Sequence, residues 1–130
     1  MPRAAGVYAE LLGEKLRRHN THCWLVNTGW AGGPFGVGER MQLPLTRAML
    51  NAALHGDLNG VPVVPHPLFK VLVPQSCPGV PSQFLDARGM WADPEGYDRA
   101  ARELSERFNR NFEKFAGVSG EIAQAAPARS

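Results

Sequence analysis

The amino-acid sequence predicts a protein of the α/β class, in which helices alternate with short strands. Two observations lead to this class. Apolar residues recur every three or four positions in three separate segments, which is typical of amphipathic helices. Two short runs of apolar and β-favouring residues lie between those segments and predict strands. A loop with four glycines within seven residues follows the first of these runs, and we expect the functional part of the chain there.

The first helix is predicted from Val7 to His19. Its apolar stripe at helical spacing consists of Val7, Leu11, Leu12 and Leu16. His19 and His22 lie close to Cys23 after this stripe, but the sequence offers no fourth partner at metal-ligand spacing. We therefore expect surface histidines here rather than metal ligands.

A buried strand is predicted over Cys23–Val26, because this run is short, apolar and bounded by polar residues. The glycine loop follows it, with glycines at positions 32, 33, 36 and 38. Glycine allows positive φ angles and close approach of the backbone, so the loop can wrap around a bound group. Phosphate is the first candidate, because consecutive backbone N–H groups can bind an anion. A mobile surface loop is the alternative that the glycines alone leave open.

Two familiar phosphate-binding motifs are absent from this loop. Gly33 and Gly38 have the spacing of a P-loop, but Glu39 and Arg40 stand where that motif requires Lys and then Ser or Thr. Met41 occupies the position of the third glycine in a dinucleotide-binding fingerprint. The loop therefore contains no standard motif that would identify its ligand.

A second helix is predicted after the loop, with Pro44 in its first turn and Gly56 at its end. Asp57–Gly60 form a turn by composition. The apolar face of this helix carries Leu45, Met49, Leu50, Ala53 and Leu54.

Three prolines make the segment Val61–Pro67 an extended stretch that cannot lie inside a sheet. The next run, Leu68–Val73, is rich in β-favouring residues and predicts a strand that ends before Pro74. No regular element is predicted from Gln75 to Gly89.

The longest helix is predicted to begin at Pro94, with Asp93 as its N-cap. Its residues at helical spacing form an aromatic stripe, which we assign to the protein core rather than to a partner-binding face. This stripe comprises Tyr97, Ala101, Leu104, Phe108, Phe112 and Phe115. Beyond Ala116 the residues are small and polar, so we expect this tail to fray.

Composition and charge exclude several classes of protein. A chain of 130 residues can form one domain or part of one, since chains of this size bury roughly two-thirds of their unfolded surface. Charged residues make up 20% and the net charge is +2, which argues against nucleic-acid binding. Cys23 and Cys77 are expected to be free thiols in a reducing compartment. The sequence lacks a membrane-span pattern and a signal-peptide pattern, which predicts a cytoplasmic protein.

Several short segments are informative through their order and spacing rather than singly. They are Val7–Glu10, Asn27–Trp30, the glycine loop, Arg40, Thr46–Ala48, Val73–Pro74, Pro78–Val80, Trp91 and Asn111–Phe115. Together they resemble the C-terminal part of ATP-dependent phosphoenolpyruvate carboxykinases. The resemblance implies the C-terminal portion of the mononucleotide-binding domain of that fold, over residues 1–116 with a long C-terminal helix, followed by a tail of residues 117–130.

The resemblance also implies an ATP-binding role for Arg40, Met41 and Thr46, at positions that in this family contact the nucleoside side of ATP. Arg40 offers a planar fork of donors for a phosphate or a face for a base, and Thr46 offers a hydroxyl. Family members often carry Lys before this arginine and Ile after it, so Glu39 and Met41 depart from the pattern. From the residues alone, Arg40 and Arg47 as surface ion-pair partners are the alternative.

The reaction implied by the resemblance is decarboxylation of oxaloacetate with phosphoryl transfer from ATP, which gives phosphoenolpyruvate, CO2 and ADP in gluconeogenesis. Mg²⁺ and Mn²⁺ would stabilise its charges. The family's P-loop, metal ligands and oxaloacetate-binding arginine precede the matched region, so we expect neither a catalytic residue nor a metal ligand here. The chain would be an inactive fragment whose partners are ATP, oxaloacetate and the rest of the enzyme. A non-enzymatic nucleotide-binding or protein-docking module is the alternative.

Overall fold

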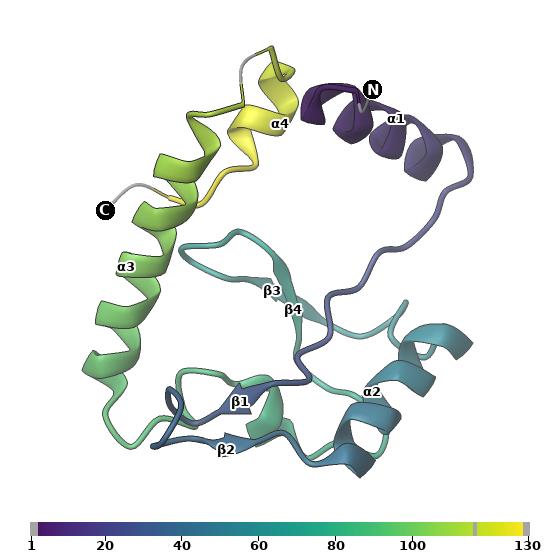
Figure 1. Cartoon of the computed structure of the whole chain (residues 1–130). Helices are drawn as coiled ribbons and strands as arrows, with labels where there is room; N and C mark the ends of the chain where they lie inside the picture. Colours follow the sequence, from purple (N-terminus) through teal and green to yellow (C-terminus); the bar gives the residue numbers. More distant parts are fainter. Residues whose placement is uncertain (1–2, 116, 129–130) are drawn as a thin grey trace. The chain divides into compact units, whose positions relative to one another are not determined.

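The computed structural model describes residues 3–115 and 117–128 (Figure 1). Its helices are α1 (Ala5–Arg18), α2 (Leu43–His55), α3 (Pro94–Phe112) and α4 (Gly120–Gln124), with a 3₁₀ helix at Ser82–Leu85, and its strands are β1 (Trp30–Ala31), β2 (Glu39–Arg40), β3 (Val63–Pro65) and β4 (Leu72–Pro74). This mixture of helices and small sheets confirms the predicted α/β class at that level.

The chain divides into two compact units. The first unit contains the residues up to Cys23, the short loop Pro67–Lys70 and the residues from Arg102 onward. The second unit contains Trp24–His66 and Val71–Ala101. Both sheets and α2 belong to the second unit, whereas α1 and α4 belong to the first.

Helix α1 confirms the first predicted helix, with its start two residues earlier than expected. Within the first unit, Gly6 lies against the backbone of Gly117. The apolar stripe is nevertheless partly open to solvent, since the exposed fraction is 40% for Leu11 and 59% for Leu12. The described part of the first unit therefore covers little of this face.

The strand predicted over Cys23–Val26 is wrong, because this segment has no regular secondary structure. Leu25 has an exposed fraction of 86%, and Cys23 is exposed instead of buried. A strand exists only where a second segment supplies the other half of its hydrogen-bond ladder. The apolar run predicted the extended chain but not the missing partner.

Helix α2 confirms the second predicted helix, and its boundaries follow from local chemistry. Pro44 lies at its first turn, and Gly56 ends it in the left-handed region with φ of 79°. Its inner face belongs to the core of the second unit, whose buried members are Ala52, Leu58, Cys77 and Val80. Trp24, Ala48, Met49, Ala53, Val61, Phe84 and Leu85 pack around them.

Strands β3 and β4 form an antiparallel pair in which Val64 lies opposite Val73. Pro65 in β3 and Pro74 in β4 are tolerated because a two-stranded ladder has only edges. The prediction of a strand over Leu68–Val73 is wrong for residues 68–71, where the chain first turns. Lys70 adopts a left-handed φ of 59°, which interrupts any extended run, so β4 begins only at Leu72.

Helix α3 begins at the predicted Pro94, but most of its predicted core stripe is not core. The exposed fractions of Leu104, Phe108 and Phe115 are 42%, 52% and 41%. Within the stripe Ala101 is buried as predicted, with 6% exposed, and Ser105, which lies outside the stripe, is also buried, with 1% exposed. Spacing predicted the apolar face correctly, but burial also requires a neighbouring segment that covers it.

The expectation that the tail frays is also wrong for residues 117–128. Ser119 caps α4 by accepting a hydrogen bond from the Ile122 N–H at 3.5 Å. Ala128 then donates its N–H to the Leu68 carbonyl at 2.7 Å within the first unit. The expected boundary at Ala116 and the last two residues lie outside the described residues. Over that described part, no helix is long and apolar enough to cross a membrane.

Candidate functional site

The glycine loop is the tight connection between β1 and β2, which pair antiparallel. The Pro34 carbonyl accepts the N–H groups of Val37 at 3.0 Å and Gly38 at 2.9 Å. A Cβ atom at Gly38 would lie 2.6 Å from the Ala31 carbonyl oxygen and would also clash with the Gly33 carbonyl, so only glycine fits there. Two N–H groups that an anion nest would use are thus engaged inside the loop itself.

Arg40 lies at the end of β2, directly opposite Trp30 on β1. Its side chain is exposed, and so is that of Arg47 on α2. Within the part of the chain that the structure describes, neither arginine takes part in an ion pair. The surface ion-pair alternative therefore finds no support among the described residues, and the Arg40 guanidinium is open to an external group.

Met41 and Thr46, the other two predicted site residues, are buried, with exposed fractions of 9% and 7%. The Met41 N–H donates to the Gly29 carbonyl at 2.8 Å and so extends the hairpin. The Thr46 N–H donates to the Gln42 carbonyl at 3.2 Å in the first turn of α2. One short segment thus carries the exposed cation and, beside it, a buried apolar side chain and a buried hydroxyl.

Sequence reasoning missed the role of Asn27, which precedes β1. Its Oδ1 accepts the Gly29 N–H at 2.8 Å, and its Nδ2 donates to the Trp30 carbonyl at 3.1 Å. The Trp30 ring meets the Phe35 ring edge to face, with centroids 5.2 Å apart. The Asn-Thr-Gly sequence is a signal that could have predicted this, because Asn side chains commonly bond the backbone two residues on.

The second unit also contains a polar cluster between the residue after β3 and the first turns of α3. His66 Nε2 and Tyr97 Oη are hydrogen-bonded at 2.8 Å, and the Trp91 ring packs edge to face on Tyr97. Burial lowers the pKa of His66 and raises the pKa of Tyr97, because both rings lose water. Arg88 binds Asp98 through two bonds of 2.8 and 2.9 Å. We interpret this cluster as structural.

Cys77 is the buried free cysteine of the second unit. Burial, and secondarily the negative charge of Asp57, raise the pKa of its thiol. A raised pKa keeps the sulfur protonated and unreactive at neutral pH. Cys77 therefore acts as a packing residue, and the described residues contain no disulfide, as predicted for these two thiols.

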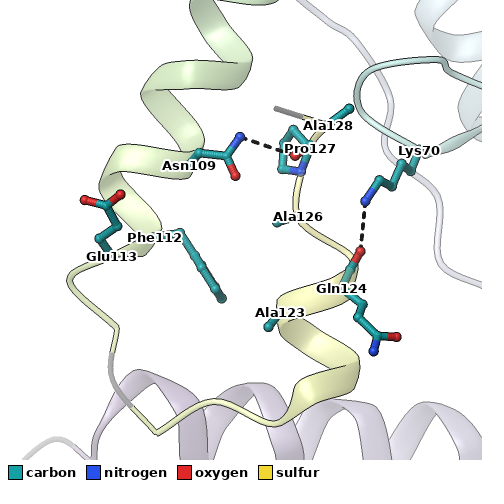
Figure 2. Close-up of a pocket in the computed structure, with 9 residues that line it drawn as sticks. All are labelled: Lys70, Asn109, Phe112, Glu113, Ala123, Gln124, Ala126, Pro127 and Ala128. Carbon is teal, nitrogen blue, oxygen red and sulfur yellow. Dashed lines mark hydrogen bonds between the residues drawn. The ribbon is translucent and has the colours of Figure 1, made fainter. Parts of the chain in front are cut away.

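The first unit contains an open pocket of about 450 Å³ between the end of α3 and α4 (Figure 2). Figure 2 shows the Phe112 ring pointing into this space from α3. Lys70 Nζ donates to the Gln124 carbonyl at 2.9 Å, and Asn109 Nδ2 donates to the Pro127 carbonyl at 3.2 Å. These hydrogen bonds hold the tail in place, and the lining of the pocket is mixed, with alanines and Phe112 beside polar side chains such as Glu113.

Metal-binding clusters were sought among the described residues, and no group of three or more His, Cys, Asp or Glu side chains suits an ion there. The donor set for the Mg²⁺ and Mn²⁺ of the expected reaction is thus not found in residues 3–115 and 117–128. The Arg40 guanidinium offers hydrogen-bond donors only, and the Thr46 hydroxyl offers one donor and an acceptor.

Comparison with known proteins gives consistent matches along the chain. Residues 1–83 match a family described as phosphoenolpyruvate carboxykinase. A phosphoenolpyruvate carboxykinase (ATP) of Moorella thermoacetica is 54% identical over 127 residues, which cover 98% of this chain and 24% of the relative. The corresponding enzyme of Thermus thermophilus is 52% identical over 98% of this chain and 24% of its own length. The chain thus spans about a quarter of the length of these relatives.

Proposed function

Because the chain belongs to the family of ATP-dependent phosphoenolpyruvate carboxykinases, we propose that it supplies one wall of the ATP site of such an enzyme, as a segment of a longer polypeptide. The observation that carries this proposal is the identity of 54% along 98% of the chain. The proposed fold is the C-terminal portion of the mononucleotide-binding domain, over residues 1–116 with the long helix, followed by the tail 117–130.

Arg40, Met41 and Thr46 are the proposed contacts to ATP. The exposed guanidinium of Arg40 donates a planar set of hydrogen bonds to a phosphate or stacks on the base. Met41 places an apolar side chain beside it, and the Thr46 hydroxyl bonds the ribose or a base edge.

The proposed reaction converts oxaloacetate and ATP into phosphoenolpyruvate, CO2 and ADP, as a step of gluconeogenesis in the cytoplasm. The C–C bond to the carboxylate breaks, its electrons form an enolate, and the enolate oxygen takes the γ-phosphoryl group. Mg²⁺ and Mn²⁺ neutralise charge in such reactions when bound. Because the described residues do not suit these ions, we assign the metals and the bond-breaking chemistry to the remainder of the enzyme.

The remainder of the enzyme is also the proposed partner for exposed apolar side chains in each unit. In the first unit, Leu12 on α1 is 59% exposed. In the second unit, Leu25 and Leu54 are 86% and 81% exposed. Large exposed apolar surface normally marks an interface. The share of about 24% that this chain covers in its relatives leaves ample polypeptide to form that interface.

The proposal is tested by two measurements. The 130-residue chain alone should form no phosphoenolpyruvate from oxaloacetate and ATP with both metals, because the groups that stabilise the transition state are missing. In the complete enzyme, Arg40→Ala should raise KM for ATP about ten- to a hundredfold with a much smaller change in kcat, as for a lost charged hydrogen bond. Arg18→Ala, at an exposed arginine of α1, is the matched control and should leave KM unchanged.

Two results would contradict the proposal. Activity of the isolated chain above background would show that it is not a dependent segment. Unchanged ATP kinetics in Arg40→Ala, together with lower thermal stability, would make the arginine a structural residue instead.

A second candidate function is a non-enzymatic docking module, and the exposed face of α3 favours it. Phe108 is 52% exposed on that face. The two candidates differ in the complete enzyme: restored carboxykinase activity on joining this chain to the rest of the polypeptide supports the first candidate. Binding of a partner without any such activity supports the second.

A further inference from the structure

The Asn27 side chain forms two hydrogen bonds to the backbone at the start of β1. In an antiparallel pair, residues directly opposite alternate between hydrogen-bonded and non-hydrogen-bonded pairs. The Met41 N–H donates to the Gly29 carbonyl at 2.8 Å, so Gly29 and Met41 form a pair of the hydrogen-bonded kind. Continuing that ladder would direct the Gly29 N–H to the Met41 carbonyl, yet this N–H donates to Asn27 Oδ1 at 2.8 Å instead. The Asn27 carboxamide therefore ends the ladder at Met41.

The same alternation decides which side chains meet beside the proposed ATP contact. Trp30 and Arg40 are opposite each other in the next pair, which is of the non-hydrogen-bonded kind. Side chains of such a pair approach each other more closely than those of the other kind. Asn27 Nδ2 holds the Trp30 carbonyl at 3.1 Å, and Phe35 packs on the Trp30 ring. The backbone on the Met41 side of Arg40 is thus linked across the ladder, through Gly29, to the Asn27 carboxamide, which also bonds the residue opposite Arg40.

We propose that Asn27 is a positioning residue for the ATP site: its carboxamide sets the backbone from which Arg40 reaches the nucleotide and Met41 packs beside it. The proposal rests on the function proposed above. Asn27 itself need not touch ATP, since its two polar atoms are already bonded to the backbone. It acts through Gly29 and Trp30, which hold β2 in register.

The experiment uses the complete enzyme that contains this segment. Asn27→Ala should raise KM for ATP about three- to tenfold, which is the effect of one or two neutral hydrogen bonds. The change in kcat should stay within about twofold, and KM for oxaloacetate should not change, because the tie orients a binding residue rather than a reacting group. Asn51→Ala removes an exposed carboxamide from α2 and is the matched control.

Asn27→Asp carries the same test if the alanine variant does not fold. An aspartate keeps the acceptor for the Gly29 N–H and loses the donor to the Trp30 carbonyl, so a rise in KM for ATP of about two- to threefold is expected. Hydrogen exchange of the Met41 amide should be faster in both variants, since its acceptor is less firmly held.

The outcomes separate this inference from the function on which it rests. If Arg40→Ala raises KM for ATP but the Asn27 variants only lower Tm, Asn27 is merely structural and the inference is wrong while the proposed function stands. If neither Arg40→Ala nor the Asn27 variants change KM for ATP, both fail. A raised KM for ATP in Asn27→Ala, with the defect reduced in Asn27→Asp, supports the inference.

Discussion

Helices α2 and α3 both carry apolar residues at helical spacing, but more of α2 is covered: Met49 and Ala53 of its predicted face pack on the core, whereas Leu50 and Leu54 stay exposed. Ala52 on α2 is 2% exposed and packs in a cluster with Leu58, Cys77 and Val80. On α3, Phe108 is 52% exposed in spite of a clear aromatic stripe. The same pattern in the sequence thus leads to a core in one region and to open apolar surface in the other.

The difference in burial depends on which segments pack against each helix. Leu58 and Val61 follow α2 closely along the chain, and Trp24 and the segment from Cys77 to Leu85 complete its cover within the same unit. The first-unit part of α3 is held by polar contacts and by the Phe69 ring, which meets the Phe108 ring edge to face with centroids 6.5 Å apart. Ser105 Oγ donates to the Ala128 carbonyl at 2.6 Å, and Asn109 Nδ2 donates to the Pro127 carbonyl at 3.2 Å. Periodicity therefore shows which face is apolar but not whether another segment covers it.

The largest expected effect comes from opening the core beside α2. Leu58→Ala should destabilise the 130-residue chain by about 2–5 kcal/mol, because it deletes buried methyl groups and leaves a cavity. Urea unfolding followed by circular dichroism measures this loss. Leu54→Ala is the matched control, since that leucine is 81% exposed, and it should change stability by less than about 0.5 kcal/mol. Equal losses in the two variants would mean that this core does not hold the unit.

A smaller effect is expected from the polar attachment of α3. Ser105→Ala should cost about 1 kcal/mol, because the hydroxyl is buried and bonded to the Ala128 carbonyl. The Ala128 amide should exchange its hydrogen faster in the variant, since its segment is released from the helix. Ser76→Ala, at an exposed serine, is the control. Unchanged exchange at Ala128 would show that the tail is held without this bond.

The aromatic stripe of α3 should contribute still less to the stability of the 130-residue chain. Phe108→Ala is expected to cost less than about 1 kcal/mol in the 130-residue chain, because the ring is half exposed and gains little on folding. A measured loss of about 3–5 kcal/mol, as for a buried aromatic ring, would contradict the conclusion that this face of α3 is open to solvent. Phe84→Ala, at a ring that packs on the core beside α2, should cost more than Phe108→Ala in the same urea experiment.

The smallest expected effect concerns the start of α3 and depends on pH. The Gly96 N–H donates to the Asp93 carboxylate, which lowers the pKa of Asp93, and Arg99 at 2.9 Å adds to the effect. A carboxylate with a lowered pKa in the folded state stabilises that state above its unfolded pKa. The stabilisation is lost as the pH falls through the lowered pKa. Asp93→Asn should therefore unfold at lower urea than wild type at pH 7, and the difference should shrink on acidification. A difference that persists at acidic pH would exclude this carboxylate as its source.

Local chemistry in the sequence is sufficient to determine the main helices of this chain. Pro44 and Gly56 bracket α2, and Asp93 with Pro94 begins α3, because each of these residues acts on backbone groups within one turn of itself. The α/β class follows from these segments and the runs between them. The family followed from the order of short segments along the chain, and comparison with known proteins bears it out.

The candidate site was only partly accessible from the sequence. Arg40, Met41 and Thr46 were predicted from the resemblance, since the residue types alone favoured Arg40 and Arg47 as surface ion-pair partners. That Arg40 is open while Met41 and Thr46 are buried depends on the hairpin and on α2. The sequence could predict that Asn27 forms a local turn. It could not predict the link from Asn27 to Met41, because that link passes through the ladder of β1 and β2.

Tertiary structure alone decided which extended runs became strands and which apolar faces became core. Cys23–Val26 has the composition of a buried strand but no partner in the described chain, whereas β1 and β2 pair across a glycine turn without a strong strand signal. Strand pairing and burial are properties of two segments, so neither can be read from one of them. A helix satisfies its own backbone within a turn, which is why the sequence by itself determined the helices.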